Sequence, residues 1–488
     1  MQQRHTDIAV LGAGSAGLSA WHTAKKYTDE VVLVEAGEYG TTCARVGCMP
    51  SKLLIAAAEA AHRVRHASTF GVNVSGIDVD GKAVMARVKG ERDRFVGSVL
   101  KSMKRIPESH RIRGYARFIQ PHTLQVDDHT QLTANAIVIA TGSRPSWPGM
   151  LESAGDRLIV NDDVFEWDTL PESVAVFGPG VIGLELGQAL SRLGVRMRMF
   201  GVGGAIGPLQ SEKVHQTADE VFNRAFYLDA DAEVKHIERQ GEGVAITFIE
   251  RGSGRELTET FDYVLAATGR KPNVDQLDIA NAELSLNEHG VPNFNRFTLQ
   301  CANADGSDSH IFIAGDANQA VPLLHEAITE GQIAARNAAN LENVQVGRRN
   351  VPLSVVFTEP QIAMVGDNRP ALEARYGGCD CIAEGGVSFG DQGRAIVMGE
   401  NHGYMALFAE HGTGQFLGAE LLGPQVEHMA HLLAWALEQK LSVSEMLTMP
   451  FYHPVLEEGL RTGLRDLNAN LKQGSAITER CMECGPGG

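Results

Sequence analysis

Cysteine is scarce in this chain of 488 residues, which has only seven, and so low a content excludes a disulfide-dense secreted scaffold. Basic residues are outnumbered, 43 Lys and Arg against 60 Asp and Glu, and the net charge of −17 excludes the basic footprint of a nucleic-acid-binding protein. No apolar run approaches the roughly 18 residues of a spanning helix, and a strand and glycine-rich turn stand where a signal peptide would lie. We therefore expect a cytoplasmic protein with neither nucleic acid nor membrane as a partner.

A glycine-rich turn stands near the N-terminus, and the length allows about three domains of roughly 150 residues. Residues 7–11 predict a strand that enters a turn containing Gly12, Gly14 and Gly17. A helix and a second strand follow, and this strand ends in Glu35. The three glycines permit a tight turn, a close approach to a pyrophosphate and close helix packing, and the acid accepts from a ribose hydroxyl. A tight turn alone would not need this whole context, so a dinucleotide site is predicted.

The same arrangement occurs a second time. Another strand leads into a turn with Gly178, Gly180 and Gly183, and each copy is followed by a segment that reads Ala-Thr-Gly. These closing segments contribute Thr141, Gly142, Gly269 and Arg270. An internal repeat of whole nucleotide-binding units implies two dinucleotides and electron transfer between them. A further short strand ends at Gly315 and Asp316, which predicts that the first unit is completed after the second is inserted into it.

Two of the cysteines, Cys43 and Cys48, are separated by only four residues. The run 51–67 predicts a helix that Pro50 opens. A thiol near a helix N-terminus is favoured as the reactive thiolate, and Lys52 adds a positive charge. Spacing alone leaves open a pair of buried structural cysteines. The flanking dinucleotide units favour a redox-active pair.

The last third of the chain has a different pattern. Segments around 403–409 and 415–422 predict an antiparallel sheet, and 426–439 predicts a long helix. A final helix follows His453 and Glu458. This pattern predicts an α+β domain rather than a third nucleotide-binding unit.

In this order the motifs resemble those of the FAD-dependent pyridine nucleotide–disulfide oxidoreductases, the group of dihydrolipoamide dehydrogenase, glutathione reductase and mercuric reductase. The resemblance implies an α/β fold with two Rossmann-like dinucleotide-binding domains, the second inserted in the first, plus an α+β C-terminal dimerisation domain. The implied parts are an FAD-binding domain at 1–150 and 271–345, an NAD(P)-binding domain at 151–270, a dimerisation domain at 346–475, and a flexible tail at 476–488 with a CxxC pair.

The resemblance also implies where the cofactors bind. FAD would occupy the first unit, with Glu35 at the adenosine ribose, Asp316 at the ribityl chain and the backbone near Ala116 at the adenine. The nicotinamide dinucleotide would occupy the second unit. Lys52 and Glu185 resemble the family's pair beside the flavin and the nicotinamide.

The catalytic roles follow from the same resemblance. Cys43 would be the interchange thiol that meets the substrate, and Cys48 the charge-transfer thiol nearer the flavin. His453 resembles the family's acid–base histidine, which Glu458 would orient. In isolation, a His followed five residues later by a Glu would more often mark the start of an ordinary helix. In this family the dyad acts in the partner subunit's site, which implies a homodimer.

The choice of dinucleotide is read from the second unit. Gly183 suits NAD, since NADP-dependent relatives often have Ala there. Gly201 stands where the next strand would end in Glu for NAD or Arg for NADP, and 202–205 contains no Arg or Lys for a 2′-phosphate. We therefore expect FAD and NAD as cofactors, with NADP less favoured, and we assign no metal site.

The expected function is oxidation of a dithiol, dihydrolipoamide or a dihydrolipoyl protein, to the disulfide, with electrons passing through Cys43–Cys48 and FAD to NAD. An alternative is an NAD(P)H-dependent reductase of a disulfide or mercuric ion that uses the tail pair Cys481 and Cys484. A redox-sensing scaffold is the non-enzymatic alternative, and an intact set of catalytic side chains argues against it.

Overall fold

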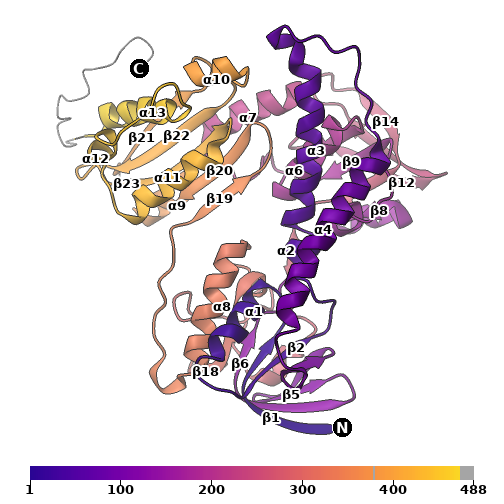
Figure 1. The fold of residues 1–488 in the computed structure, drawn as a ribbon, viewed down its shortest axis with the longest axis vertical. Helices are drawn as coiled ribbons and strands as arrows, with labels where there is room; N and C mark the ends of the chain where they lie inside the picture. Colours follow the sequence, from indigo (N-terminus) through magenta and orange to yellow (C-terminus); the bar gives the residue numbers. More distant parts are fainter. Residues whose placement is uncertain (377–379, 473–488) are drawn as a thin grey trace.

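The computed structural model describes residues 1–376 and 380–472, so the tail cysteines Cys481 and Cys484 lie outside the described residues. Figure 1 shows three regions, each built around a sheet of its own. Within the described ranges, no helix has the length and apolarity that crossing a membrane requires. The cytoplasmic location stays a prediction.

The first sheet contains both the N-terminal strand and a strand from beyond residue 300. Its strands are β1 (Gln2–Leu11), β2 (Val31–Glu35), β3 (Arg111–Arg113), β4 (Ala116–Gln120), β5 (Thr123–Val126), β6 (Thr130–Ile139), β17 (Gln300–Ala302) and β18 (Asp308–Ile313). The order is β17-β18-β6-β1-β2-β3, with β2, β1, β6 and β18 parallel. Because β18 pairs with β6, the sheet is completed only after the intervening unit, as predicted.

Two helices far apart in the sequence lie side by side at this sheet (Figure 1). They are α1 (Ser15–Ala24) and α8 (Leu324–Ala338). A Cβ atom on Gly331 would lie 2.2 Å from the carbonyl oxygen of Ala16, so their backbones are in direct contact. The core strands beneath are apolar on both faces, as covered parallel strands must be.

The second sheet is formed entirely by the inserted unit. Its parallel strands are β8 (Leu158–Ile159), β9 (Ser173–Phe177), β10 (Arg196–Phe200), β11 (Tyr227–Asp229) and β15 (Tyr263–Ala266), in the order β11-β10-β9-β15-β8. Helices α5 (Asn161–Val164), α6 (Val181–Arg192) and α7 (Glu212–Ala225) and an antiparallel sheet of β12 (Val234–Gln240), β13 (Gly243–Ile249) and β14 (Glu256–Phe261) belong to this unit. A short antiparallel pair, β7 (Ser143–Pro145) and β16 (Arg270–Pro272), joins the two units.

The third sheet is antiparallel, as predicted. It consists of β19 (Leu353–Val356), β20 (Gln361–Gly366), β21 (Ile382–Ser388), β22 (Tyr404–Glu410) and β23 (Phe416–Gly423), in the order β19-β20-β23-β22-β21. Its helices are α9 (Arg369–Arg375), α10 (Gly393–Met398), α11 (Val426–Glu438), α12 (Val443–Leu447) and α13 (Glu457–Asn470). The predicted helix at 426–439 and the final helix are therefore both present.

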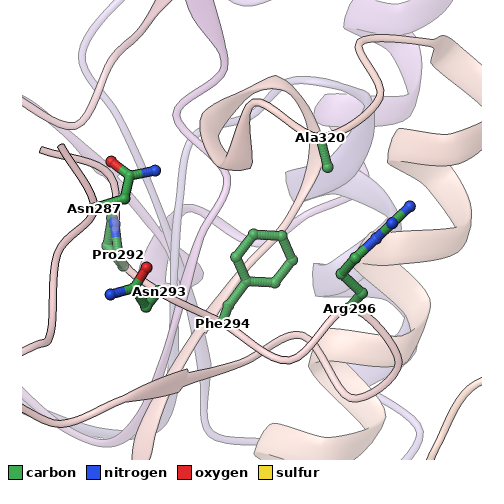
Figure 2. A pocket seen from close by; sticks show the side chains of 6 residues that line it. All are labelled: Asn287, Pro292, Asn293, Phe294, Arg296 and Ala320. Carbon is green, nitrogen blue, oxygen red and sulfur yellow. The ribbon is translucent and has the colours of Figure 1, made fainter. Parts of the chain in front are cut away.

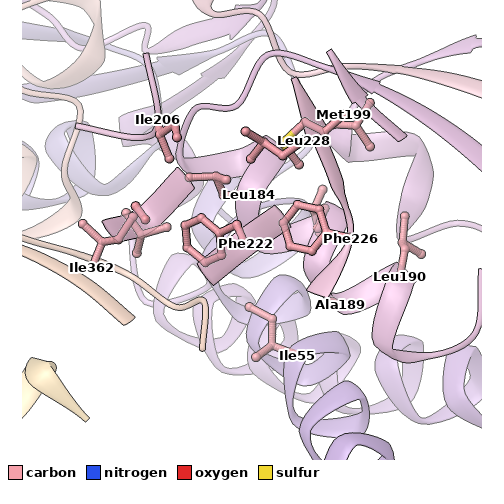
Figure 3. Packing of buried hydrophobic residues seen from close by; sticks show 14 of the residues in the cluster. Ile55, Leu184, Ala189, Leu190, Met199, Ile206, Phe222, Phe226, Leu228 and Ile362 are labelled. Carbon is pink, nitrogen blue, oxygen red and sulfur yellow. The ribbon is translucent and has the colours of Figure 1, made fainter. Parts of the chain in front are cut away.

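One apolar core is shared by the second unit, the third sheet and the helices α3 (Cys48–His66) and α4 (Gly81–Met103). Helix α3 packs against both α6 and α4. Figure 3 shows Ile55 of α3 beside Leu184 of α6, Phe222 of α7 and Ile362 of β20. Burying one such side chain stabilises the fold by about 1.5–3 kcal/mol. The helix that begins at Cys48 is thereby fixed against both neighbouring domains.

Candidate active site

The two cysteines predicted to form the redox pair lie on either side of a tight turn between two helices. Cys43 is in α2 (Thr42–Arg45), and Cys48 is the first residue of α3. The helix begins at Cys48, two residues before Pro50, which was predicted to open it, so the predicted start was wrong. Pro50 is the third helical residue, where its missing N–H costs nothing because the first four N–H groups of a helix have no intrahelical acceptor. The earlier start places the sulfur of Cys48 at the helix N-terminus itself.

The reduced pair concentrates its negative charge on one sulfur. The pKa of Cys48 is lowered from 9.0 to about 6, first because the Cys43 thiol donates a hydrogen bond to it and also because the Lys52 ammonium is close. The pKa of Cys43 is raised, because its proton is held in that hydrogen bond and its thiol is partly buried. The hydrogen bond from Cys43 and the nearby ammonium therefore favour Cys48 as the thiolate of the reduced pair.

Lys52 forms an ion pair with a buried carboxylate of the second unit. Its Nζ lies 2.6 Å from Oε2 of Glu185, whose side chain is 5% exposed. The backbone N–H of Phe357 donates to the other oxygen of Glu185 at 2.9 Å, and the Phe357 ring lies 4.6 Å from the ammonium. This contact thus joins three parts of the chain. Lys52 comes from the first unit, Glu185 from the second unit, and Phe357 from the segment that directly follows β19.

The first glycine-rich turn is shaped to receive a phosphate group. Gly12 has φ +107°, and a Cβ there would lie 2.2 Å from the carbonyl oxygen of Ala140. A Cβ on Gly17 would lie 1.8 Å from the Gly12 oxygen, whereas one on Gly14 would meet nothing within 4 Å. The hydroxyl of Thr141 is buried without a partner. An open backbone cradle and an unpartnered hydroxyl fit the FAD diphosphate.

The Glu35 side chain lies next to the same turn and is fixed there by two hydrogen bonds. Its two carboxylate oxygens accept from the backbone N–H groups of Ala13 at 2.6 Å and Gly37 at 2.7 Å. The N–H of Gly114 donates to the backbone carbonyl of Glu35, which brings Ala116, the first residue of β4, close to this end of the sheet. The structure therefore gathers the two positions predicted for the adenosine end.

Arg270 belongs to the predicted second unit, but its side chain forms hydrogen bonds with the first unit. Its Nε donates to the Ser143 hydroxyl at 2.8 Å and one terminal nitrogen to the Ser143 carbonyl at 2.7 Å. Ser143 in turn donates to the carboxylate of Asp316 at 2.8 Å. Sequence reasoning missed Ser143. Its only signal was that it follows Thr141-Gly142 just as Arg270 follows Thr268-Gly269.

A buried ionic network supports the turn that carries Gly315 and Asp316. Glu330 is 1% exposed and accepts from the Gly315 N–H and the Asn318 amide, each at 2.7 Å. Arg349 pairs with Glu330 and with Glu326, each at 2.8 Å. This network connects the predicted FAD turn to the segment that leads into the third sheet.

The second glycine-rich turn opens into a pocket of about 300 Å³. A Cβ on Gly178 would lie 2.5 Å from the Ala267 oxygen and one on Gly183 2.0 Å from the Gly178 oxygen, while Gly180 has free space. Residues 266–270 line the opposite side of the pocket. The cradle repeats that of the first unit and fits a second dinucleotide.

The predicted dyad is formed. Nδ1 of His453 lies 3.1 Å from both carboxylate oxygens of Glu458, which is 11% exposed and also accepts from the Val455 N–H at 3.2 Å. The imidazole itself is 66% exposed. Among the contacts of the described residues, none joins this imidazole to a cysteine of its own chain.

A separate hollow of about 360 Å³ lies on the first unit, and Figure 2 shows its lining side chains. They are Asn287, Pro292, Asn293, Phe294, Arg296 and Ala320. None of the predicted site residues lines it, so we give it no part in the chemistry.

The sequence pattern of the pyridine nucleotide-disulphide oxidoreductases matches residues 6–331, and that of their dimerisation domain matches 352–463. This chain belongs to that family. It is a flavoprotein disulfide oxidoreductase whose cofactors are FAD and NAD(H), and the predicted fold class is confirmed.

Several proteins are similar over nearly the whole chain. A dihydrolipoyl dehydrogenase of Bacillus subtilis is 28% identical over 93% of this chain and 94% of its own length. One from Chlamydia trachomatis is 29% identical over 93% and 94%. The HOCl-induced flavoprotein disulfide reductase RclA from Escherichia coli superposes with a TM-score of 0.78 at 21% identity, covering 94% and 99%. LpdA from Mycobacterium tuberculosis superposes with 0.77 at 23% identity, covering 95% and 99%.

Proposed function

We propose that this enzyme oxidises a dithiol to a disulfide and reduces NAD, with dihydrolipoamide or a protein-borne dihydrolipoyl group as the substrate. The observation that carries the proposal is the position of Cys48 as the first residue of α3, one turn before Lys52, whose ammonium pairs with the buried Glu185. The thiolate of Cys48 is favoured there, and its pKa is lowered. The names of the curated relatives support this substrate class. We also propose that the FAD-binding domain comprises 1–150 and 271–345, the NAD(P)-binding domain 151–270 and the dimerisation domain 346–475.

The thiol chemistry starts from the oxidised pair. A substrate thiolate attacks the sulfur of Cys43, the Cys43–Cys48 bond breaks, and Cys48 leaves as the thiolate, which its low pKa favours. The second substrate thiolate then attacks the substrate's own sulfur in the mixed disulfide with Cys43, so that the substrate disulfide closes and Cys43 leaves as a thiolate. Two electrons now reside on the cysteine pair. FAD, when bound, carries them onward as a hydride equivalent to NAD.

Two protons must leave the substrate thiols. We propose that the partner subunit's His453 accepts the first and returns it to Cys43 when Cys43 leaves as a thiolate, and that the second is released to solvent. An imidazole held by a carboxylate is the usual acid–base arrangement and contributes roughly 10²–10⁴-fold. The match to the family's dimerisation domain supports a homodimer in which each dyad serves the other subunit's cysteines. Lys52, Glu185 and the glycine cradles are proposed to position the two dinucleotides.

The primary test is NADH formation from NAD with dihydrolipoamide. Rapid turnover that Cys43→Ser abolishes is the expected result. If the protein instead oxidises NAD(P)H with a disulfide or mercuric ion, and loses this activity in Cys481→Ser/Cys484→Ser, the reductase alternative replaces the proposal.

Subunit complementation tests the shared site. Cys43→Ser and His453→Gln homodimers are each expected to be inactive, but a mixed dimer of the two contains one site with both groups intact. Recovery of about half the wild-type activity per dimer is expected. No recovery would mean that each dyad acts on its own chain.

A further inference from the structure

The two dinucleotide units can be aligned residue by residue through a shared hydrogen bond. In the first unit, the N–H of Gly12 donates to the carbonyl of Val34 at 2.8 Å, and the next residue is Glu35. In the second unit, the N–H of Gly178 donates to the carbonyl of Phe200 at 2.8 Å, and the next residue is Gly201. Gly201 therefore occupies the position at which a nucleotide-binding strand usually carries its ribose-binding acid.

No side chain fits at that position. A Cβ on Gly201 would lie 2.5 Å from the carbonyl oxygen of Ala230 and 2.8 Å from Cγ of Pro179. The backbone is fixed there as well, because the Gly201 N–H donates to the Asp229 carbonyl at 2.7 Å. The missing carboxylate thus follows from the packing of the loop and could not be restored by substitution at residue 201.

Val202 is the neighbouring side chain that lines the pocket, and it is 88% exposed. Arg270 is the charged residue among those that line the pocket, and its guanidinium is engaged by Ser143. The nearby carboxylate of Asp231 accepts from the Gly203 N–H at 2.8 Å and is not among the lining residues. Among the described residues that line this pocket there is therefore no carboxylate to select NAD, and the one cation, Arg270, is already hydrogen-bonded to Ser143.

We propose that Val202 sets the dinucleotide preference of this enzyme, and that it makes the preference weak. A ribose hydroxyl bonded to a carboxylate would gain roughly 10- to 150-fold in affinity, and a 2′-phosphate would be repelled by the same charge. With Val202 facing water, the 2′-phosphate stays hydrated and meets no lining carboxylate. NADP therefore binds within about tenfold of NAD. The proposal requires that the second unit binds a nicotinamide dinucleotide, as in the family. It does not require that the substrate is a dithiol.

The test uses ligands that contain only the adenosine end. Dissociation constants of 5′-AMP and 2′,5′-ADP are measured by calorimetry on the FAD-loaded protein, so that the flavin site is closed to them. A ratio below about tenfold is expected, and a larger ratio in either direction overturns the proposal. Because no turnover is measured, the result is independent of the proposed dithiol activity.

Three variants test the assignment. Val202→Glu is expected to raise the preference for 5′-AMP at least tenfold, while the neutral Val202→Gln changes the ratio less than threefold. If Val202→Glu leaves the ratio unchanged, residue 202 does not face the ribose and the proposal fails. Asp231→Asn is expected to change 5′-AMP affinity less than threefold. A loss of tenfold would identify Asp231 as the ribose acid and would also overturn the proposal.

Discussion

The backbone N–H of Phe357 donates to the carboxylate of Glu185 at 2.9 Å, and the other oxygen of the same carboxylate accepts from Lys52 at 2.6 Å. Phe357 directly follows β19, whereas Glu185 is on α6. The orientation of a buried carboxylate at the redox centre is thus set by a strand of the third sheet. Because a backbone group supplies the contact, substitution of the Phe357 side chain cannot remove it.

Replacing Glu185 with Gln should disturb catalysis through Lys52. The neutral amide removes the charge partner of the ammonium, and loss of such an orienting partner typically costs 10- to 100-fold in activity. The loss of a hydrogen bond between charged groups should lower the free energy of unfolding by about 1–3 kcal/mol. Steady-state kinetics and denaturant unfolding measure the two effects. Asp168→Asn, which breaks a surface pair of the same 2.6 Å length with Lys89, should leave turnover unchanged.

The reduced enzyme should have one thiol that reacts at unusually low pH. Since only the thiolate is alkylated, a pKa of about 6 for Cys48 moves the onset of its reaction with iodoacetamide from near pH 9 to near pH 6. Replacing Lys52 with Met should move the onset upward. Mass spectrometry identifies the modified cysteine. Preferential modification of Cys43 at pH 6 would contradict the assignment.

The same shift predicts how stability depends on pH. Between about pH 6 and 9 the folded protein has lost the Cys48 proton while the unfolded chain still holds it, so the contribution of Cys48 to the free energy of unfolding of the reduced protein rises with pH in this window. As the pH falls toward 6, this contribution is lost. Glu359, whose pKa burial raises to about 8, contributes with the opposite sign below that pH. The difference in free energy of unfolding between the reduced wild type and Cys48→Ala should therefore grow with pH from about 6 to 9, since the contribution of Glu359 is common to both proteins. A difference that does not change with pH would contradict the assignment.

Removing the Ser143 hydroxyl should weaken FAD binding. Ser143→Ala leaves the Asp316 carboxylate without a donor and leaves Arg270 Nε unpaired, and a lost bond to a charged group corresponds to roughly a tenfold lower affinity. Equilibrium release of FAD, followed by its fluorescence, measures the change. Ser143→Thr keeps the hydroxyl and should retain FAD. Equal losses in both variants would point to packing rather than to the hydrogen bond.

Two adjacent arginines offer a matched comparison. Arg349→Met leaves the buried carboxylates of Glu326 and Glu330 without their cation and should lower the free energy of unfolding by about 3 kcal/mol. Arg348→Met breaks a pair with Glu438 in which the arginine is 76% exposed, and little change is expected. Denaturant midpoints at constant m-value compare the two. Equal effects would mean that burial of the Arg349 network contributes nothing.

The features predicted correctly from the sequence are those with local signals. Glycine spacing and strand periodicity located both strand–turn–helix units, which the structure contains. The Cys43–Cys48 spacing left two readings open, and the redox assignment of the pair stays a prediction. The Lys52–Glu185 contact joins residues far apart in the sequence and was reached only through the resemblance to a family.

Other features carry no local signal. Ser143 acquires its role because β7 pairs with β16 across two domains. Phe357 acts through a backbone N–H, which any residue but proline possesses. The start of α3 was misplaced because proline is tolerated throughout the first helical turn and not only at its first position.

The pairing of β18 with β6 has a consequence for synthesis. The five strands of the second sheet are contained in 158–266, so that sheet can form while β18, which begins at Asp308, has not yet been translated. At about 5–20 residues per second, the ribosome takes roughly ten to thirty seconds to travel from β6 to β18. During that time Ile137, Val138 and Ile139 form an apolar strand edge without its partner, the type of surface that chaperones shield on a nascent chain.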